Sequence, residues 1–339
     1  MIPHSQPWIT SKELIELDTI LKTFEISPGK LNVELAEKIS RNLSKRRTLL
    51  TASGSSSLYL ILTLMNIGVG DEVIIPTYVC ESVLHAIRLR GATPILCDIG
   101  EFWVMTYQNV RPLITKRTKA IILVHIFGIN AWNEDFLSIK IPVIEDICQA
   151  FELNKGDSMP GTNTPYAFGS FHGTKCIGAG SGGFASFSSE KFIDDTINAN
   201  SDWKILGTMS NLHASIALSI LDKYEEILSK RLHIANQYFK KMPPHATDKL
   251  NKISNKTMYF RFPLISSMSW DVTSKSFAAE NIIVRKGVDA LLHRKIGVDD
   301  KNFKNSVETY DKTVSIPILA QMDNAQVNTV IDAVNTIIK

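Results

Sequence analysis

The sequence predicts an α/β protein with a mostly parallel central sheet flanked by helices, and with a smaller α+β domain at its C-terminal end. Between residues 58 and 147, short apolar runs alternate with helical stretches, which is the pattern of parallel strands joined by helices. Glycines stand where these helices are expected to end, because glycine takes the left-handed cap conformation cheaply. The length of 339 residues argues for about two domains. We expect an N-terminal arm and large domain over residues 1–230 and a small domain over 231–339.

Two helices are predicted before this alternating region. Thr10 and Glu13 form a capping-box pattern, and an apolar series follows that suits a helix with one buried face. A break at Pro28 is followed by a second helical pattern, which is expected to end near Arg47. The apolar series of the first helix is Leu14, Ile15, Leu17, Ile20 and Leu21.

The remaining elements follow from apolar periodicity and from the turn residues between them. Helices are expected at 58–67, 81–89 and 135–139, and strands at 72–75, 93–97, 120–124 and 143–144. Two strand-like runs follow residue 183, and one long helical segment from 212 to about 239 is expected to connect the domains. The C-terminal part is expected to hold strands at 258–264, 282–284 and 313–316, a helix at 272–280 and a last helix from 323. The chemistry of such a fold is expected at the carboxyl ends of its parallel strands.

Composition narrows the functional classes. Hydrophobic residues make up 44% and charged residues 21%, as in an ordinary globular protein, and the net charge is +3 without a long basic run. No segment reaches the roughly 18 apolar residues of a membrane span. The four cysteines lie far apart without zinc-type spacing, and Cys97 and Cys148 are expected to be small buried hydrophobes. We therefore expect a cytoplasmic protein with no metal site and no nucleic-acid or membrane partner.

A serine-rich segment is a candidate anion site. Gly54, Ser55 and Ser56 lead directly into a predicted helix, whose N-terminal N–H groups favour an anion such as phosphate. On this segment alone, an ordinary serine N-cap explains the pattern equally well. The glycine-rich residues 178–183 contain G-x-G-x-x-G, but a strand-like run follows them. They are expected to form a loop between strands and not a dinucleotide site.

Two further residues complete a chemical set. Asp146, next to Glu145, ends a predicted buried strand, where a carboxylate needs a cationic partner. Lys175 lies in a Gly/Thr turn beside the glycine-rich loop, where a lone lysine is usually a solvated loop residue. Together with the serine segment, the two residues match what pyridoxal phosphate requires: an anion site, a carboxylate for the ring nitrogen and a lysine for the Schiff base.

At this point the sequence resembles the DegT/DnrJ/StrS family of pyridoxal-phosphate-dependent sugar aminotransferases, over nearly the whole chain. The resemblance implies the aspartate aminotransferase fold, type I of the pyridoxal enzymes. It is carried by residues 53–55, 70–76, 91–94 with Asp98, 117–122, 124–125 with Gly128, 143–146 with Gln149 and Ala150, and 170–175 with Gly182 and Gly183.

The resemblance also implies roles for individual residues. Lys175 matches the lysine that carries the cofactor, and Asp146 matches the aspartate paired with the pyridine nitrogen. Gln149 matches the glutamine near the ring hydroxyl. The other positions implied to contact the cofactor are Gly54, Ser55, Ser56, Cys80, Ser170 and His172, of which the serines fall at phosphate-contacting positions.

Four departures from the family pattern are visible. Cys80 stands where the family usually stacks an aromatic ring on the cofactor, with Tyr78 two residues before it. Ser181 stands where an acid usually precedes the double glycine, and Thr208 where an asparagine or arginine often reaches the neighbouring subunit's phosphate. The family's usual histidine-bearing loop after Arg285 has no obvious counterpart. Because of these departures, the substrate is the property that the sequence determines least.

The predicted function is transamination from glutamate to a keto sugar, expected to be nucleotide-linked, in surface-polysaccharide or amino-sugar biosynthesis. The resemblance implies a homodimer with active sites at the subunit interface, and the helix before Pro28 resembles the arm that packs on the partner. Two alternatives stay open. One is a pyridoxal enzyme with another acceptor or another reaction, although Lys175 argues against the family's dehydratases, in which a histidine replaces it. The other is a degenerate cofactor-binding protein.

Overall fold

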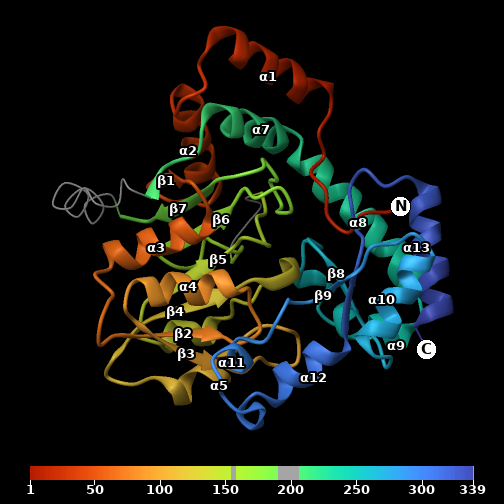
Figure 1. Cartoon of the computed structure of the whole chain (residues 1–339). Coiled ribbons are helices and arrows are strands. Elements are labelled where there is room, and N and C mark those ends of the chain that lie inside the picture. The colour runs from red at the N-terminus through yellow and green to blue at the C-terminus, as the bar shows by residue number, and fades with distance from the viewer. Residues whose placement is uncertain (154–157, 190–205, 339) are drawn as a thin grey trace.

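The computed structural model describes residues 1–153, 158–189 and 206–338, and its central feature is a seven-stranded sheet (Figure 1). Only β7 runs against its neighbours, so the prediction of a mostly parallel sheet is confirmed. The first run predicted after residue 183 is β7, whereas the second falls outside the described residues. In spatial order the strands are β1 (Arg47–Thr51), β7 (Gly183–Phe187), β6 (Tyr166–Ser170), β5 (Val143–Asp146), β4 (Thr118–Val124), β2 (Glu72–Pro76) and β3 (Thr93–Cys97).

Helices pack on both faces of this sheet, because successive strand residues point to opposite sides. On one face, Val73, Ile75 and Ile122 pack in a core with α3 (Gly54–Leu64) and α4 (Glu81–Leu89). On the other face, Ile74 and Ile121 pack with the short α5 (Tyr107–Val110) and with the 3-10 turn Glu134–Ser138, where a helix was predicted. A further core under β1 and β7 includes α2 (Lys30–Asn42) and α7 (Asn211–Asp222).

Three predicted boundaries were wrong for local reasons. The second helix ends at Asn42 and not near Arg47, since Ser44 takes a left-handed conformation (φ 52°) and β1 begins at Arg47. The first helix of the sheet region starts at Gly54, four residues early, because the Ser53 hydroxyl caps it. The long helical segment is two helices, α7 and α8 (Tyr224–Lys241), which meet at Lys223.

The C-terminal part forms a second, antiparallel sheet in the order β8 (Phe262–Ile265), β10 (Thr313–Ile316) and β9 (Arg285–Lys286). A strand was predicted at 282–284, but the strand of this region that pairs with β10 is β9, which begins at Arg285. Ile282 instead forms a bridge with Ile2 near the N-terminus. The predicted domain boundary at residue 230 falls inside α8, and the division into two domains stays a prediction. The helices of this part are α9 (Pro244–Asn251), α10 (Trp270–Ala279), α11 (Leu292–Lys295), α12 (Lys304–Lys312) and α13 (Asn324–Ile337).

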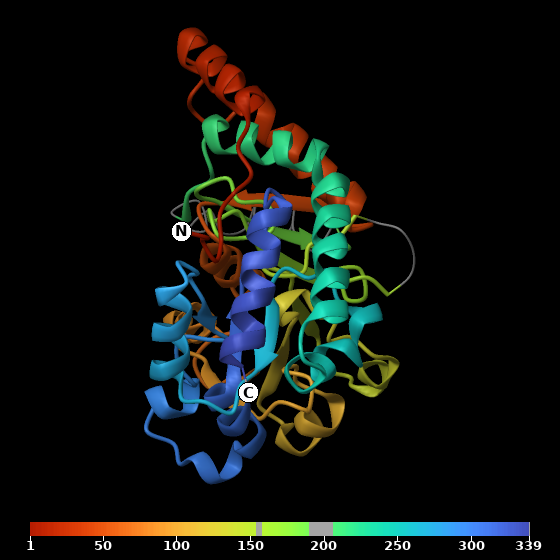
Figure 2. The same cartoon turned by 90° about the vertical axis from the view of Figure 1, so that its right-hand side faces the viewer.

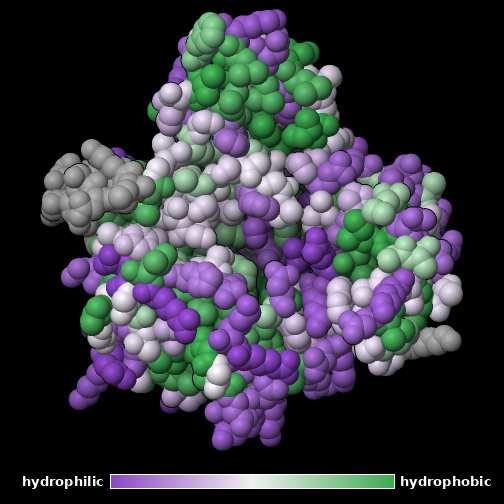
Figure 3. All heavy atoms as spheres, in the orientation of Figure 1, coloured by the Kyte–Doolittle hydropathy of each residue, from purple (hydrophilic) through white to green (hydrophobic). Residues whose placement is uncertain are grey.

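The N-terminal helix α1 (Ser11–Thr23) projects from the body of the molecule and lies along α7 (Figure 2). Its predicted capping residue Thr10 donates its backbone N–H and its hydroxyl to Glu13, both at 2.6 Å. Of its apolar series, Ile20 is buried at 6% exposed, whereas Leu14 is 63% exposed and Ile15 67%. Figure 3 shows apolar side chains gathered over this end of the molecule. The predicted apolar series is therefore only partly buried in the single chain, because Ile20 is buried while Leu14, Ile15 and Leu21 are exposed.

Among the described residues, no helix is both long and apolar enough to cross a lipid bilayer.

Candidate active site

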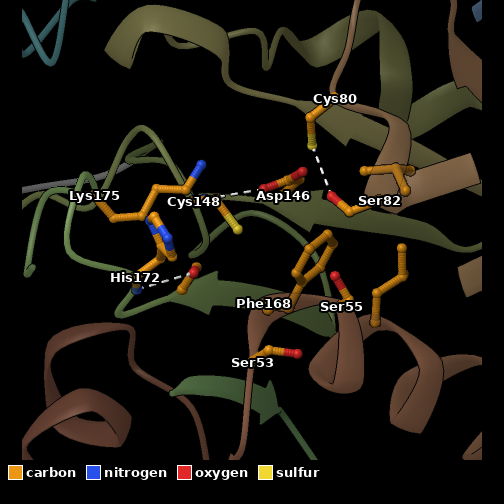
Figure 4. A pocket seen from close by; sticks show the side chains of 13 residues that line it. Ser53, Ser55, Cys80, Ser82, Asp146, Cys148, Phe168, His172 and Lys175 are labelled. Atoms are coloured by element: carbon orange, nitrogen blue, oxygen red, sulfur yellow. Dashed lines mark hydrogen bonds between the residues drawn. The ribbon is translucent and has the colours of Figure 1, made fainter. Parts of the chain in front are cut away.

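The carboxyl ends of the parallel strands surround a cavity of about 220 Å³ (Figure 4). Asp146 comes from the end of β5, and Ser170 from the end of β6. Lys175 comes from the loop after β6, and Gly54 and Ser55 from the start of α3. The polar groups therefore meet where an open α/β sheet places its ligand. The full lining is Ser53, Gly54, Ser55, Leu58, Cys80, Ser82, Val83, Asp146, Cys148, Phe168, Ser170, His172 and Lys175.

The two adjacent carboxylates at the end of β5 have separate surroundings. Glu145 is fully buried and is held by the turn after residue 160, whose Gly161 and Asn163 backbone N–H groups donate to it at 2.8 and 3.0 Å. His125 donates to it from Nε2 at 3.1 Å, since the Ala131 N–H occupies Nδ1. These bonds to the charged form lower the pKa of Glu145 despite its burial. Glu145 is thus satisfied within the protein.

Asp146 has no such set of partners. It is 4% exposed, and its Oδ1 accepts the backbone N–H of Cys148 at 3.0 Å. Burial raises its pKa, although the charge of Lys175 acts in the opposite direction. A buried carboxylate is stabilised when a cation is placed against it. The cavity next to Asp146 therefore suits a protonated ring nitrogen, such as that of pyridoxal phosphate.

The start of α3 forms one wall of the cavity. Ser53 caps the helix: its Oγ accepts the Ser56 N–H at 3.1 Å and its carbonyl accepts the Ser57 N–H at 3.0 Å. The side chain of Ser55 lines the cavity, whereas the Ser56 hydroxyl lies 3.0 Å from that of Ser53 and is not part of the lining. This wall combines a helix N-terminus with a serine hydroxyl, as a phosphate requires.

Position 54 leaves little space for a side chain. A Cβ atom at Gly54 would lie 3.0 Å from Ser170 Cβ and 3.4 Å from Cys148 Sγ. Each of these two neighbours also lines the cavity. A side chain at this position would therefore take up room where α3, β6 and the loop after β5 converge.

The loop that carries Lys175 is tied to the same wall. It connects the antiparallel strands β6 and β7, and Gly182 donates its N–H to Ala52 O at 3.1 Å, just before α3. Gly180 and Gly182 have φ of 92° and 117°, which side chains rarely adopt. The prediction that the glycine-rich residues form a loop is confirmed. The ring of His172, at the start of this loop, is exposed, and its Nδ1 lies 3.0 Å from Thr174 Oγ1.

A narrower cavity adjoins the first and shares four of its residues. Gln149 lines it, and its Oε1 accepts the Phe127 N–H at 2.9 Å. The shared residues are Cys80, Asp146, Cys148 and Lys175. Of the residues predicted to contact the cofactor, all but Ser56 therefore line one of the two cavities.

Sequence reasoning missed several lining residues. Cys148 was expected to be a small buried hydrophobe, yet it is half-buried and lines both cavities, whereas Cys97 is buried as predicted. The position of Cys148, two residues after Asp146 at the carboxyl edge of the sheet, was the signal available in the sequence. Ser82 and Phe168 carried no signal, because α4 and β6 become neighbours only in the folded chain. Tyr78 is 1% exposed and packs edge-on against Phe127, outside both cavities.

Comparisons with known proteins identify the family and the fold. The model of the DegT/DnrJ/EryC1/StrS aminotransferase family matches residues 7–335. A GDP-perosamine synthase from Escherichia coli O157:H7 is 25% identical, with 98% of each chain aligned. An aminotransferase of this family from Brucella abortus has a similar structure, with a TM-score of 0.87, 19% identity and 96% and 95% of the two chains covered. The sugar aminotransferase Spr1654 from Streptococcus pneumoniae, solved in a PLP form, gives a TM-score of 0.83 at 22% identity, with 99% and 98% covered.

Proposed function

This chain belongs to the DegT/DnrJ/EryC1/StrS family of pyridoxal-phosphate-dependent aminotransferases, and we propose that it moves an amino group from glutamate to a nucleotide-linked keto sugar. The observation that carries the proposal is that Lys175, Asp146 and the start of α3 line one cavity. The type I fold of solved sugar aminotransferases supports it as well. The expected setting is amino-sugar or surface-polysaccharide biosynthesis in the cytoplasm.

Three parts of the cavity would hold the cofactor. The carboxylate of Asp146 would keep the proton on the ring nitrogen, and Ser55, Ser170 and the N-terminus of α3 would bind the phosphate. Gln149 would lie near the ring hydroxyl. When bound, pyridoxal phosphate supplies the carbonyl that carries the amino group and a ring that takes up an electron pair.

Lys175 would perform two tasks. Its Nζ would hold the cofactor at rest. When free and neutral, the same Nζ would accept a proton from the substrate carbon and return one, which requires an uncharged amine. The loop tied to Ala52 holds this amine at the cavity that Asp146 lines, so that both act on the same bound group.

The absorption spectrum of the purified protein tests the central step. A yellow protein that bleaches with excess glutamate is expected, whereas Lys175→Ala should lack the lysine-bound band and should turn over at less than about a thousandth of the wild-type rate. Lys45→Met, which changes a lysine outside both cavities, serves as a control and should keep the band if it folds. Near-normal turnover by Lys175→Ala would contradict the assignment.

The acceptor is tested separately. The protein in its amine form is mixed with 4-keto-6-deoxy sugars linked to GDP, UDP or dTDP, and the return of the yellow band is followed. Return of the yellow band with one of these sugars supports the proposal and identifies the nucleotide. A protein that bleaches with glutamate but accepts none of them would act on another ketone, and a colourless protein that cannot be reconstituted would not be an aminotransferase.

A homodimer is part of the proposal. Leu14 and Ile15 on α1 and Phe24 just after it are 63%, 67% and 84% exposed, and Figure 3 shows apolar side chains gathered at this end of the molecule. Such a surface is typical of a protein–protein interface. In this family the opening helix packs on a second subunit, and we assign α1 that task.

A further inference from the structure

A segment of the C-terminal part holds the turn that leads into one wall of the cavity. Thr77 directly follows β2, and the chain then enters this wall, because residues 79, 80, 82 and 83 line one or both cavities. The short helix α11 carries His293 and contacts Thr77, and Figure 1 shows it apart from α10 and α13. The wall is therefore attached to a segment that lies more than 200 residues later in the chain.

Hydrogen bonds join Thr77 to α11. The Thr77 carbonyl accepts the Leu292 N–H at 3.0 Å, and its hydroxyl oxygen accepts the His293 N–H at 3.0 Å. The same hydroxyl lies 2.7 Å from Nδ1 of His293. Because the oxygen already accepts a hydrogen bond, the hydroxyl hydrogen is free to donate to Nδ1. Thr77 and His293 are both 0% exposed, so water does not compete for these bonds.

The far side of the His293 ring is fixed as well. Its Nε2 lies 2.8 Å from Oδ1 of Asp300, and the ring stacks on Phe303 with a centroid distance of 4.2 Å. Arg294 donates to both oxygens of Asp300, and together with His293 it lowers the pKa of that carboxyl. The charged Asp300 accepts the Nε2 hydrogen, which leaves Nδ1 as the acceptor for Thr77. The ring is thus held in the tautomer that Thr77 requires.

The same C-terminal segment also packs on the next residue of the turn. A Cβ atom at Gly287 would lie 1.8 Å from the Tyr78 hydroxyl and 2.9 Å from Cζ of Phe127. A glycine at this position therefore lets the backbone approach Tyr78 closely. Because the contacts fall on two successive residues just before the wall, they determine where residues 79–83 lie.

We propose that His293 is a positioning residue of the cofactor site, which holds Thr77 in place and thereby sets the wall formed by residues 79–83. His293 lines neither cavity, so it acts through Thr77 and not on the cofactor. The inference rests on the proposed function only for the identity of the cofactor. Without the imidazole, the Thr77 hydroxyl loses its buried acceptor, and the ligand itself must order the wall, which weakens binding.

The chain contains a matched control for this contact. Ser306 on α12 is also 0% exposed, and its hydroxyl donates to Oδ1 of Asp98 at 2.5 Å. Asp98 follows β3, the strand next to β2, but it lines neither cavity. Thr77→Val and Ser306→Ala therefore each remove one buried hydroxyl that joins the C-terminal part to a strand end. Of these two strands, only β2 leads into the wall.

Hydrogen exchange of the cofactor-free protein gives the first test. Backbone amides of residues 77–83 should exchange at least about fivefold faster than in wild type in Thr77→Val and in His293→Phe, which keeps a ring to stack on Phe303. Ser306→Ala should leave exchange in this segment unchanged. Thr77→Ser keeps the hydroxyl and should exchange as slowly as wild type. Unchanged exchange in both Thr77→Val and His293→Phe would overturn the inference.

Cofactor affinity gives the second test, and a merely structural contact would not change it. The dissociation constant of pyridoxal phosphate should rise about three- to tenfold in Thr77→Val and His293→Phe, and should stay within about twofold of wild type in Thr77→Ser and Ser306→Ala. Faster exchange at residues 77–83 with an unchanged dissociation constant would make His293 a structural contact only and would overturn the proposal. A wild-type protein that binds no pyridoxal phosphate would instead contradict the proposed function itself.

Discussion

At the scale of single residues, Glu145 and Asp146 show how two neighbouring carboxylates acquire different tasks. A strand turns successive side chains to opposite faces, so Glu145 meets His125 and the turn after residue 160, while Asp146 meets the cavity. The pKa of Glu145 is lowered by its hydrogen bonds, whereas burial raises that of Asp146. The first carboxylate stabilises the fold, and the second costs stability until a cation binds.

The substitution Asp146→Asn should separate stability from activity. The pKa of Asp146 is higher in the folded than in the unfolded protein, so its contribution to stability is greatest at low pH and is lost as the pH rises through the folded-state pKa. At pH 7 the cofactor-free Asn variant should therefore melt at a higher temperature than the cofactor-free wild type. Its turnover should fall by orders of magnitude, because the ring nitrogen loses its charged partner. Unimpaired turnover would remove Asp146 from this role.

The substitution Glu145→Ala should act in the opposite way on stability. It leaves His125 Nε2 and the N–H groups of Gly161 and Asn163 buried without their acceptor. Breaking a buried charged pair typically costs about 3–5 kcal/mol, and urea unfolding monitored by circular dichroism measures the loss. A loss below about 1 kcal/mol would show that Glu145 is not the structural carboxylate of the pair.

At the scale of elements, local contacts fix the position of each helix that contributes to the site or to the arm. The cap at Ser53 sets the start of α3, and the Gly182–Ala52 hydrogen bond brings the lysine loop to that start. The helix α1 is held against α7 and α8 by Glu13, which accepts hydrogen bonds from Ser219 at 2.8 Å and from the Lys223 ammonium. The cap is local, whereas the Gly182–Ala52 and Glu13 contacts join segments that are distant in the chain.

The substitution Gly54→Ala should weaken cofactor binding more than it weakens the fold. The added Cβ meets Ser170 Cβ at 3.0 Å and Cys148 Sγ at 3.4 Å, so these lining residues must give way. We expect the dissociation constant of pyridoxal phosphate to rise about tenfold or more, with a loss of unfolding free energy of about 1 kcal/mol, the lower end of the usual cost of an added group, because one side of the position is open cavity. Fluorescence titration measures the first and urea unfolding the second. An unchanged dissociation constant would show that the start of α3 lies outside the binding site.

The attachment of α1 should depend on pH. Burial alone would raise the pKa of Glu13, but the Lys223 ammonium and the Thr10 donors lower it to about 2. The contribution of Glu13 to stability is thus complete above pH 4.5 and is lost as the pH falls toward 2. The difference in urea midpoint between wild type and Glu13→Gln should therefore narrow between pH 5 and pH 3. A constant difference would show that the charge of Glu13 is not involved.

At the scale of the whole molecule, the chain leaves an apolar arm and a polar cavity at separate places on one fold. The cavity lies at the carboxyl edge of the sheet, whereas α1 extends beyond the sheet with its apolar side chains exposed (Figure 3). Removing such a face from water stabilises the buried state by about 25 cal/mol per Å² of apolar surface, which favours association of two chains.

Replacing apolar residues of the arm should produce monomers. The double variant Leu14→Glu with Ile15→Glu places two charges on this face, and size-exclusion chromatography with light scattering should give half the wild-type mass. Leu137→Glu, at a side chain 72% exposed elsewhere, is the matched control and should leave the mass unchanged. A wild-type monomer, or a dimer that persists in the double variant, would contradict the assignment of α1.

The sequence by itself determined the order of strands and helices in the parallel region, since apolar periodicity and glycine caps are local signals. It also indicated much of the candidate site: Asp146 closes β5, the serine segment opens α3, and Lys175 lies in the loop after β6, all at the same edge of the sheet. The family resemblance pointed to Asp146 and not to Glu145, but only the tertiary structure showed why the two differ: Glu145 is bonded within the protein, while Asp146 lines the cavity. It alone showed that Cys148 lines the site and that much of the apolar series of α1 is exposed, since burial is a property of contacts between segments far apart in the chain.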